Sequence, residues 1–392
     1  MNTKLAKIDP LALRPTVMDV DLDALEHNFK AISGLTPAEV MPVVKANAYG
    51  HGIVESTRVL ERAGARLFGV ALLEEGIELR EAGIKAPILV FGGISGAQVK
   101  YFIDYDLQIT ASSVGKLKNI DEVARETGKR AQVHLKIDTG LGRIGVQWHS
   151  ATDLLKAATE VTHTDVVGIY SHFANADQID LAFTHTQIER FESVIEFYRQ
   201  ANLPLPKLHL ANSAAILRVP EAHYDYVRPG IMLYGVLPNN CSSFSGLELK
   251  PVMSIRSKVV FFKVLRAGCG VSYGHTWTSA HDTRIVTVPI GYGDGYLRRL
   301  SNQGKVLING KRYPVVGAIC MDQLMVNIGG EDEAFNGDEV VLLGQQSGRY
   351  GTGQITISDI AQAADARMHE VLTATNMRVP RRYHYHGKTF IE

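Results

Sequence analysis

Eight short apolar runs alternate with segments of helical periodicity over the first part of the chain. The runs cover residues 41–47, 66–72, 87–93, 107–112, 131–139, 166–173, 207–212 and 226–235. Between them, segments such as residues 53–64 and 154–161 carry apolar residues at helical spacing. Repeated strand and helix units joined by right-handed crossovers close into a (β/α)₈ barrel with parallel strands. The sequence therefore predicts an α/β barrel.

From about residue 251, strand-like runs follow one another without helices between them. They cover residues 253–265, 283–293, 305–329 and 338–344. The Asn309-Gly310 pair lies inside the third run and predicts a hairpin, because a type I′ turn needs positive φ at both central residues. We therefore predict two domains, a barrel over residues 1–245 and a mainly β domain over residues 246–392, and a chain of 392 residues can bury both cores.

The charge balance and the cysteine count exclude several functional classes. Lys+Arg and Asp+Glu both number 41, so no net positive field favours nucleic acid or an anionic membrane, and a small-molecule substrate is expected. The chain has no apolar run long enough to span a bilayer and no apolar core before Asp9, which predicts a cytoplasmic protein. Three scattered cysteines are too few for a disulfide framework or a zinc site, so no metal is expected.

In a barrel of this type, functional side chains lie where the strands end at the carboxyl face. Lys45 follows the apolar pair Val43-Val44 and precedes small residues and glycines. Its ammonium suits either a structural cation at the rim or a reactive amine that forms a Schiff base, and both interpretations remain open. Further polar residues at or just beyond the strand ends are Lys136, Asp138, Arg143, His172, Asn212, Ser213, Arg228 and Tyr234.

Several motifs near these ends also admit a purely structural interpretation. Residues 140–145 match G-x-G-x-x-G, but they follow the fifth run and lead into an extended stretch, which disfavours a nicotinamide enzyme. Asp138 suits either a cap of the glycine turn or a role in a functional site. His172 suits either a core position or a role in a functional site. Ser213 begins a short helical segment, where a serine can be an N-cap or lie at a phosphate site.

Five motifs occur in a fixed order through almost the whole chain. They are VKANAYGHG at residues 44–52, RPGI at 228–231, VSYG at 271–274, GYGDG at 291–295 and CMD at 320–322. In this order they resemble the alanine racemases, pyridoxal-phosphate enzymes with a (β/α)₈ barrel. The resemblance implies pyridoxal 5′-phosphate as cofactor and interconversion of L-alanine and D-alanine, with D-alanine supplied for peptidoglycan.

The resemblance also implies two bases for the reaction. Lys45 would hold the cofactor as a Schiff base and act on one face of the substrate Cα, while Tyr273 would act on the opposite face. His172 and Arg228 would lie in the hydrogen-bond chain behind Tyr273. Arg228 would also donate to the pyridine nitrogen, because arginine stays protonated, and this favours racemisation over decarboxylation.

The remaining contacts to cofactor and substrate follow from the same resemblance. The cofactor phosphate would be held by Ser213, Gly230, Ile231 and Tyr49. Arg143, Tyr292 and the backbone at Met321 would contact the cofactor ring oxygen or the substrate carboxylate. Lys136 matches a position that is often carbamylated, and the carbamate would hold Arg143 by a charge-assisted pair.

The active unit implied by the resemblance is a homodimer in which Tyr273, Tyr292 and Met321 complete the site of the partner subunit. The chain departs from the family pattern at two positions. Met377 stands where many members have a phosphate-binding tyrosine, and Ala318 where many have arginine. A flexible thioether leaves a roomier pocket, so serine is also expected as a substrate. Two alternatives are a serine or broad-specificity racemase and a non-catalytic protein that binds pyridoxal phosphate.

Overall fold

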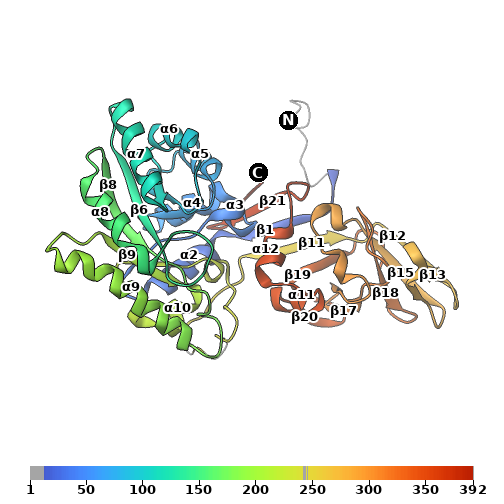
Figure 1. Ribbon diagram of the computed structural model, residues 1–392. Coiled ribbons are helices and arrows are strands. Elements are labelled where there is room, and N and C mark those ends of the chain that lie inside the picture. Colours follow the sequence, from blue (N-terminus) through green and yellow to red (C-terminus); the bar gives the residue numbers. More distant parts are fainter. Residues whose placement is uncertain (1–12, 242–243, 245, 392) are drawn as a thin grey trace. The chain divides into compact units, whose positions relative to one another are not determined.

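The computed structural model describes residues 13–241, 244 and 246–391. Contacts divide the chain into two units, each described by itself below (Figure 1). The barrel unit comprises residues 24–48 and 52–250, and the β unit comprises residues 49–51, those up to 23 and those from 251 onward. Among the helices of these described ranges, none has the length and apolar composition needed to cross a membrane.

The barrel unit is built on parallel strands that close into a ring. Around the ring they follow in the order β2 (Glu39–Val40), β10 (Tyr226–Arg228), β9 (Lys207–Asn212), β8 (Thr164–Tyr170), β6 (Ala131–Asp138), β5 (Gln108–Ala111), β4 (Ile88–Val90) and β3 (Phe68–Val70). The ring closes because Val43, which follows β2, forms a parallel bridge with Gly69 of β3. Within the described residues, the short strand β7 (Val146–Gln147) lies beside β6 and pairs with it. The predicted (β/α)₈ barrel is thus confirmed.

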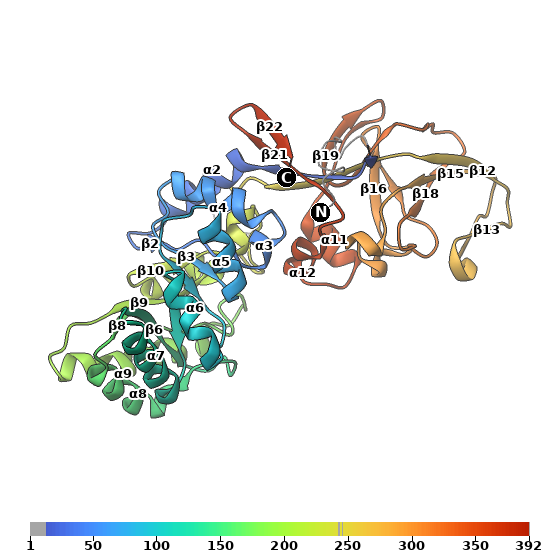
Figure 2. The same ribbon diagram turned by 90° about the horizontal axis from the view of Figure 1, so that it is seen from above.

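Helices cover the outside of the barrel strands, as Figures 1 and 2 show. They are α2 (Leu22–Ser33), α4 (Ile53–Arg62), α5 (Leu73–Glu81), α6 (Val99–Asp104), α7 (Val114–Thr127), α8 (Thr152–Glu160), α9 (Ala182–Gln200) and α10 (Ser213–Arg218). In α4, Ile53, Val59 and Leu60 are buried at helical spacing, so one apolar face packs inward. The Ser113 hydroxyl caps the start of α7, and Gly128 in the left-handed region ends it.

The β unit contains three sheets within its described residues. The largest has the order β17 (Lys311–Pro314), β16 (Lys305–Ile308), β19 (Glu339–Gly348), β11 (Met253–Lys258), β1 (Val17–Asp21), β21 (Arg381–Tyr385) and β22 (Lys388–Ile391), with β20 (Gly351–Ile355) on β19. A second sheet has the order β12 (Phe261–Leu265), β15 (Thr283–Val288) and β18 (Leu324–Gly329). The third pairs β13 (Gly270–Val271) with β14 (Trp277–Thr278). Helices α11 (Ile357–Ala363) and α12 (Met368–Ala374) follow β20, and the predicted mainly β second domain is confirmed.

Strand β1 joins the sheet of the β unit although it lies near the start of the chain. It pairs antiparallel with β11 and parallel with β21, and Met18 and Val20 are fully buried there. The predicted division at residues 245 and 246 groups this strand with the barrel domain. In the structure its partners are strands more than two hundred residues later, and no local sequence signal names them.

The Asn309-Gly310 pair forms the predicted hairpin turn between β16 and β17. Asn309 has φ 52° and Gly310 has φ 82°, and the two strands pair directly on either side. Both values lie in the left-handed region, as a type I′ turn requires. The turn prediction is therefore confirmed.

Candidate functional site

Lys45 begins a left-handed turn at the carboxyl end of a barrel strand. The turn, α3 (Lys45–Tyr49), has φ values of 54° at Ala46, 55° at Asn47, 51° at Ala48 and 52° at Tyr49. Each non-glycine residue in this region costs about 1–2 kcal/mol, so four in succession need support from their surroundings. Strain of this kind concentrates at functional sites, which marks the segment around Lys45 as a candidate.

Hydrogen bonds from neighbouring elements hold this turn in place. The side-chain oxygen of Asn47 accepts from the Ile53 N–H at 2.7 Å, which satisfies the first turn of α4. The Ala46 N–H donates to Glu75 Oε1 of α5 at 2.5 Å. Burial of Lys45, together with the charge of Arg143, lowers the pKa of its ammonium, and Glu75 opposes this decrease. Lys45 therefore releases its proton more readily than an exposed lysine does, which suits a reactive amine.

Arg228, the last residue of β10, is buried and donates to several acceptors inside the barrel. Its Nη2 donates to the Ser171 carbonyl at 2.7 Å, the Leu210 carbonyl at 3.1 Å and His172 Nδ1 at 3.2 Å. Its Nη1 donates to His209 Nδ1 at 2.8 Å. Burial lowers the pKa of Arg228 to about 10, so the guanidinium remains protonated near neutral pH. It is a fixed cation that can only donate hydrogen bonds.

His172 lies close to four cations that the sequence predicts for the site. Burial holds the pKa of His172 well below its usual value, and the charges of Arg228, Lys136, Arg143 and Lys45 lower it further. Charges that shift the pKa of a buried group in this way lie within a short distance of it. The structure thus brings these five predicted residues together at the carboxyl ends of the barrel strands, although they come from four separate parts of the sequence.

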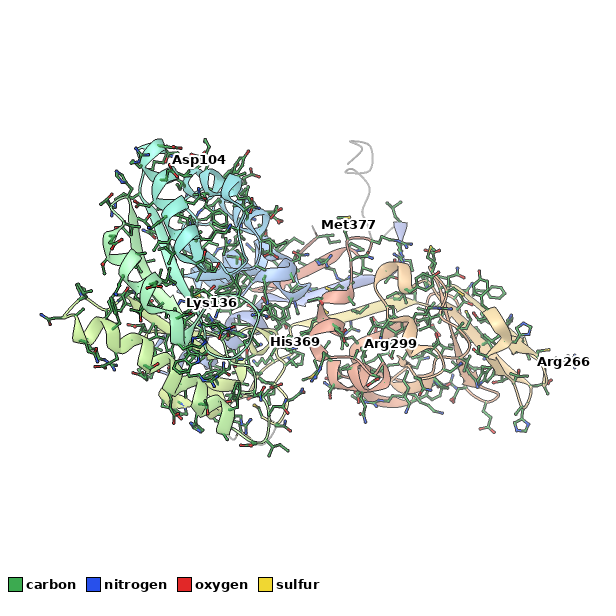
Figure 3. All side chains as sticks on the ribbon, viewed as in Figure 1. Asp104, Lys136, Arg266, Arg299, His369 and Met377 are labelled. Carbon is green, nitrogen blue, oxygen red and sulfur yellow. The ribbon has the colours of Figure 1, made fainter. Side chains whose placement is uncertain are left out.

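Lys136 lies within the barrel (Figure 3) and is buried. Among the described residues, no carboxylate is bound to its ammonium. Its Nζ donates to the Ile137 carbonyl at 2.9 Å and lies 4.8 Å from the centre of the Tyr170 ring. Burial and then the charge of Arg228 lower the pKa of Lys136 to about 7. The nearby carboxylate of Asp138 accepts instead from the N–H groups of Gly140 and Gly142, so Asp138 caps the glycine turn.

Ser213 and Gly230 are joined directly by a hydrogen bond at a second strand end. The Gly230 N–H donates to Ser213 Oγ at 2.9 Å, and Ile231 begins the 3₁₀ turn η5 (Ile231–Tyr234). The N-cap of α10 is Asn212, whose side-chain oxygen accepts from Ala215 N–H at 3.1 Å. Ser213 is therefore not the cap, and its hydroxyl lies beside the backbone at the start of the 3₁₀ turn that follows Gly230, an arrangement that suits an anion.

The remaining predicted site residues belong to the β unit. Tyr49 is buried there beside His369, with ring centres 6.0 Å apart, and burial raises the pKa of Tyr49 to about 12. Tyr273, Tyr292 and Met321 are exposed, and Tyr273 retains 75% of its accessible surface. Exposure of three large side chains in one chain leaves them available to a second molecule.

Hydrogen bonds to backbone carbonyls join the loops that carry Tyr273, Tyr292 and Met321. The Tyr292 N–H donates to the Cys320 carbonyl at 3.1 Å, and the N–H that follows it donates to the Met321 carbonyl at 2.8 Å. The Ser272 hydroxyl donates to the Ala318 carbonyl at 2.5 Å. The structure therefore assembles these loops into one surface of the β unit.

Sequence reasoning missed the residues that support this site from behind. His209 and His134 are buried in strands β9 and β6, and the side chain of Tyr170 stacks on the His209 ring at 4.7 Å with an angle of 2°. Glu75 and the left-handed turn after Lys45 were also not predicted. Alternation along the strands marks inward positions, but it does not distinguish a supporting histidine from a core histidine.

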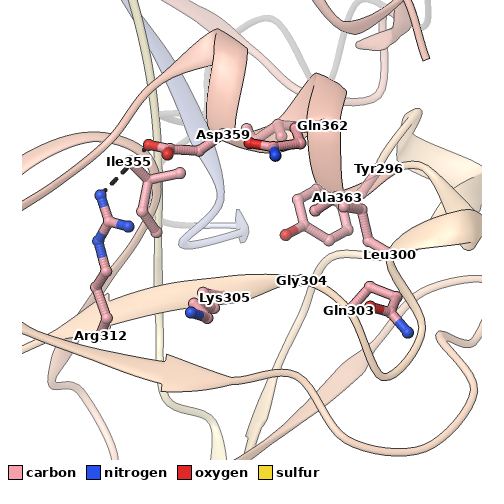
Figure 4. Close-up of a pocket in the computed structure, with 11 residues that line it drawn as sticks. Tyr296, Leu300, Gln303, Gly304, Lys305, Arg312, Ile355, Asp359, Gln362 and Ala363 are labelled. Carbon is pink, nitrogen blue, oxygen red and sulfur yellow. Dashed lines mark hydrogen bonds and ion pairs between the residues drawn. The ribbon is translucent and has the colours of Figure 1, made fainter. Parts of the chain in front are cut away.

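The β unit also has a cavity of about 210 Å³ that none of the predicted site residues lines (Figure 4). It lies between α11 and the loop before β16, with Tyr296 and Leu300 on one side and Lys305 on the other. Its guanidinium, Arg312, is already paired with Asp359 at 3.3 Å. The Arg312–Asp359 pair thus serves the fold, and the candidate site residues remain those at the strand ends of the barrel and, separately, those on the loops of the β unit.

Comparison with known proteins identifies relatives along the whole chain. The family model described as "Alanine racemase, N-terminal domain" matches residues 20–238, and that described as "Alanine racemase, C-terminal domain" matches residues 252–383. An alanine racemase of Carboxydothermus hydrogenoformans is 44% identical over 372 residues, which cover 95% of this chain and 100% of that protein.

Two solved structures share the fold over almost their whole length. An alanine racemase of Clostridium difficile superposes with a TM-score of 0.90 at 36% identity, covering 96% of this chain and 98% of that one. An alanine racemase of Bartonella henselae with covalently bound pyridoxal phosphate has a TM-score of 0.85 at 28% identity, covering 94% of this chain and 99% of that one.

Proposed function

Because this chain belongs to the alanine racemase family, we propose that it interconverts L-alanine and D-alanine with pyridoxal phosphate as its cofactor. The observation that carries the proposal is the meeting of Lys45, His172 and Arg228 at three strand ends. A half-buried amine with a lowered pKa lies beside a neutral histidine and a fixed guanidinium. Such a set of groups suits proton transfer at the substrate Cα beside a bound cofactor.

The residues of the barrel fit pyridoxal phosphate by their chemistry. Lys45 supplies the amine for the aldehyde, and Ser213 with the backbone at Gly230 and Ile231 supplies donors for the phosphate. Arg228 supplies a donor for the pyridine nitrogen, since its contacts in the described part of the chain leave the guanidinium protonated. When bound, the cofactor stabilises negative charge on the substrate Cα.

Within this proposal, Lys45 and Tyr273 move the Cα proton on opposite faces. Lys45 takes or returns the proton on one face, and Tyr273 does so on the other. Arg143, Tyr292 and the backbone at Met321 orient the substrate carboxylate. Support for Tyr273 comes from its exposure on the β unit and from its position in the VSYG motif.

We further propose that the active unit is a homodimer with shared sites. Tyr273, Tyr292 and Met321 are exposed in one chain, and Lys45 and Arg228 lie in a different unit of that chain. In a dimer with two-fold symmetry the same contact occurs twice. The surface of each β unit that carries these side chains would then meet the barrel of the partner subunit. The proposed product, D-alanine, would then supply peptidoglycan synthesis, as in the family.

The experiment that tests the function follows both the cofactor and the reaction. Purified protein should carry the visible absorbance of bound pyridoxal phosphate, which Lys45→Ala should lose, while Lys118→Ala, at an exposed position of α7, should keep it. In deuterium oxide, L-alanine should exchange its Cα hydrogen while D-alanine accumulates. A protein that binds the cofactor but forms no D-amino acid from alanine or serine would be a non-catalytic binder, and the proposal would fail.

Substrate preference is the part of the proposal that needs its own measurement. A broad-specificity or serine racemase would use the same two bases, so the site residues alone do not separate these enzymes. Initial rates over alanine, serine and larger amino acids separate them. We expect alanine to give the highest kcat/KM and serine to be used measurably.

A further inference from the structure

A continuous chain of hydrogen bonds crosses the interior of the barrel from Arg228. Arg228 Nη1 donates to His209 Nδ1 at 2.8 Å, and His209 Nε2 lies 2.8 Å from His134 Nδ1. His134 Nε2 lies 3.0 Å from Gln108 Oε1, and Gln108 Nε2 donates to Gln132 Oε1 at 2.8 Å. Gln132 is exposed near the start of β6. The chain thus runs from the carboxyl end of the strands to solvent at their amino end.

The direction of every bond in this chain is set by Arg228. A guanidinium only donates, so His209 must accept at Nδ1 and carry its proton on Nε2. His134 must then accept at Nδ1 and also carry its proton on Nε2, and the amide oxygen of Gln108 accepts that proton. The amide orientation of Gln108 in the structure agrees with this order.

The neutral state of both histidines is consistent with their surroundings. Burial and the charge of Arg228 lower the pKa of His134 to about 3 and hold the pKa of His209 well below its usual value. The acceptors of the Arg228 guanidinium among the described residues are neutral groups, either imidazoles or carbonyls. Its positive charge is therefore not cancelled by a carboxylate, and it remains available at the mouth of the barrel.

Strand β8 leaves room for the chain of hydrogen bonds to cross from β9 to β6. Gly168 of β8 is the register partner of His134, and a Cβ added there would lie 2.1 Å from His134 Nδ1, the atom that accepts from His209. Two residues later, the Tyr170 ring stacks on His209, and its hydroxyl is 2.8 Å from Thr110 Oγ1. A missing side chain and a stacked ring thus hold the two imidazoles in contact.

We propose that His134 and Gln108 are positioning residues, which hold Arg228 in place as a charged donor through a one-directional hydrogen-bond chain across the barrel. This role rests on the proposed racemase function. Without an acceptor at His134, the Nε2–H of His209 is buried and unpaired. The His209 ring then turns or shifts toward another acceptor, so that its Nδ1 no longer lies opposite the Arg228 N–H. The guanidinium loses one of its fixed contacts.

The first test reads the histidine protons directly and needs no turnover. Protein labelled with ¹⁵N-histidine, with signals assigned by substitution, should show His134 and His209 protonated on Nε2 alone near neutral pH. His134→Gln, which retains one acceptor and one donor, should keep the His209 Nε2–H hydrogen-bonded and its proton signal far downfield, whereas His134→Met should move that signal upfield or abolish it. A proton on Nδ1 of either histidine in the wild-type protein would overturn the proposal.

The second test measures the consequence for the reaction. His134→Met and Gln108→Met should lower kcat by about tenfold, with His134→Gln recovering much of the loss. KM for alanine should stay within about twofold, because neither residue reaches the mouth of the barrel. Gly168→Ala should act like His134→Met, whereas Gly115→Ala, where an added Cβ meets nothing within 4 Å, should be silent. Ile109→Val controls for weakened packing of β5.

The outcomes separate this role from the function on which it rests. A wild-type protein that racemises alanine while His134→Met matches its kcat overturns the positioning role alone. A folded, cofactor-loaded wild-type protein that forms no D-amino acid overturns the proposed function, and the positioning role with it. Equal losses in His134→Gln and His134→Met, with the His209 Nε2–H signal unchanged in both, indicate a packing role and also overturn the proposal.

Discussion

The guanidinium of Arg228 donates from Nη2 to Nδ1 of His172 across 3.2 Å. This contact fixes the histidine with its proton on Nε2, because a protonated Nδ1 would face a donor. His172 is therefore neutral, in agreement with a pKa held well below the usual value by burial and by Arg228. A neutral imidazole with an oriented N–H can donate to a tyrosinate, which is the role that the proposed mechanism needs behind Tyr273.

Replacing Arg228 by lysine should reduce activity while keeping the charge. A lysine ammonium has one nitrogen and cannot reach His209, His172 and the Ser171 carbonyl together, as the planar guanidinium does. We expect kcat to fall about a hundredfold in both directions of racemisation. Arg218 of α10 donates to the backbone carbonyls of Ala176 and Ile179, so Arg218→Lys is the matched control and should change kcat little. Wild-type rates in Arg228→Lys would contradict the assignment.

The positions of the main site residues followed from the sequence because they depend on strand ends. Lys45, His172 and Arg228 each follow a short apolar run, and parallel strands of a barrel all end at one face. The supporting residues could not be predicted in the same way. His134 and His209 are flanked by apolar residues within strands, and which inward residues face one another depends on the stagger of the closed barrel.

Two further features depend on structure that local patterns do not encode. The left-handed turn from Ala46 to Tyr49 opposes the intrinsic preference of alanine, and it is held by contacts with Glu75 and Ile53 that form only after folding. The sequence of β1 predicts a strand but specifies neither its partners nor its register. Its pairing with β11 and β21 is set by the packing of the β unit. In both cases tertiary contacts outweigh the local preference.

Mixing two inactive variants should restore activity if the sites are shared between subunits. Lys45→Ala removes the barrel half of the site, and Tyr273→Phe removes the half on the β unit. In a mixed dimer with shared sites, one site carries both changes and the other carries neither. Equal mixing then gives about a quarter of wild-type sites.

The measurement is racemase activity after the two variants are unfolded together and refolded as a mixture. Each variant refolded alone is the control and should stay inactive. Sites built from a single chain would leave one change in every site of a mixed dimer. Mixtures as inactive as the separate variants, with mixed dimers demonstrated by a tag on one of them, would therefore exclude the shared site.

Lys136 should react with carbon dioxide to form a carbamate. The uncharged amine is the reactive form, and a pKa of about 7 makes this form abundant above neutral pH. A carbamate also replaces a cation near Arg228 and Arg143 by an anion, which their charges favour. Protein equilibrated with ¹³C-bicarbonate near pH 8 should show a carbamate ¹³C signal that disappears in Lys136→Ala and persists in Lys118→Ala. Lack of the signal in the wild-type protein would refute this modification.

Asp294 should stabilise the β unit in a pH-dependent way. It is fully buried and accepts from both terminal nitrogens of Arg14, at 2.7 and 2.5 Å, and from the Gly291 N–H at 3.0 Å. Burial opposes ionisation, but these hydrogen bonds outweigh it and lower the pKa of Asp294. A carboxyl with a lower pKa in the folded protein stabilises the fold above its unfolded pKa of about 4, and this contribution is lost as pH falls through the folded value.

Asp294→Asn should therefore lower the free energy of unfolding by about 3 kcal/mol near pH 7, because it leaves a partly buried guanidinium without its carboxylate. The difference from wild type should shrink as the pH falls below about 4. Urea unfolding followed by circular dichroism at several pH values measures both effects. Asp153→Asn, at an exposed position of α8, is the control. A pH-independent difference would show that the carboxylate charge of Asp294 is not the cause.

Met377→Tyr should shift substrate preference toward alanine. Met377 is 87% exposed in one chain, and it stands where many family members carry a tyrosine that binds the cofactor phosphate and narrows the mouth of the site. A rigid ring replaces a flexible thioether, so the larger side chain of serine should lose more than that of alanine. We expect the ratio of kcat/KM for alanine to that for serine to rise about threefold or more, as for one added group in a pocket. Met377→Leu, similar in size to the native residue, should leave the ratio unchanged. Equal ratios in the wild-type protein and Met377→Tyr would place this residue outside the substrate path. Relaxed specificity would then be assigned to another position, and Ala318→Arg would be the next variant to test.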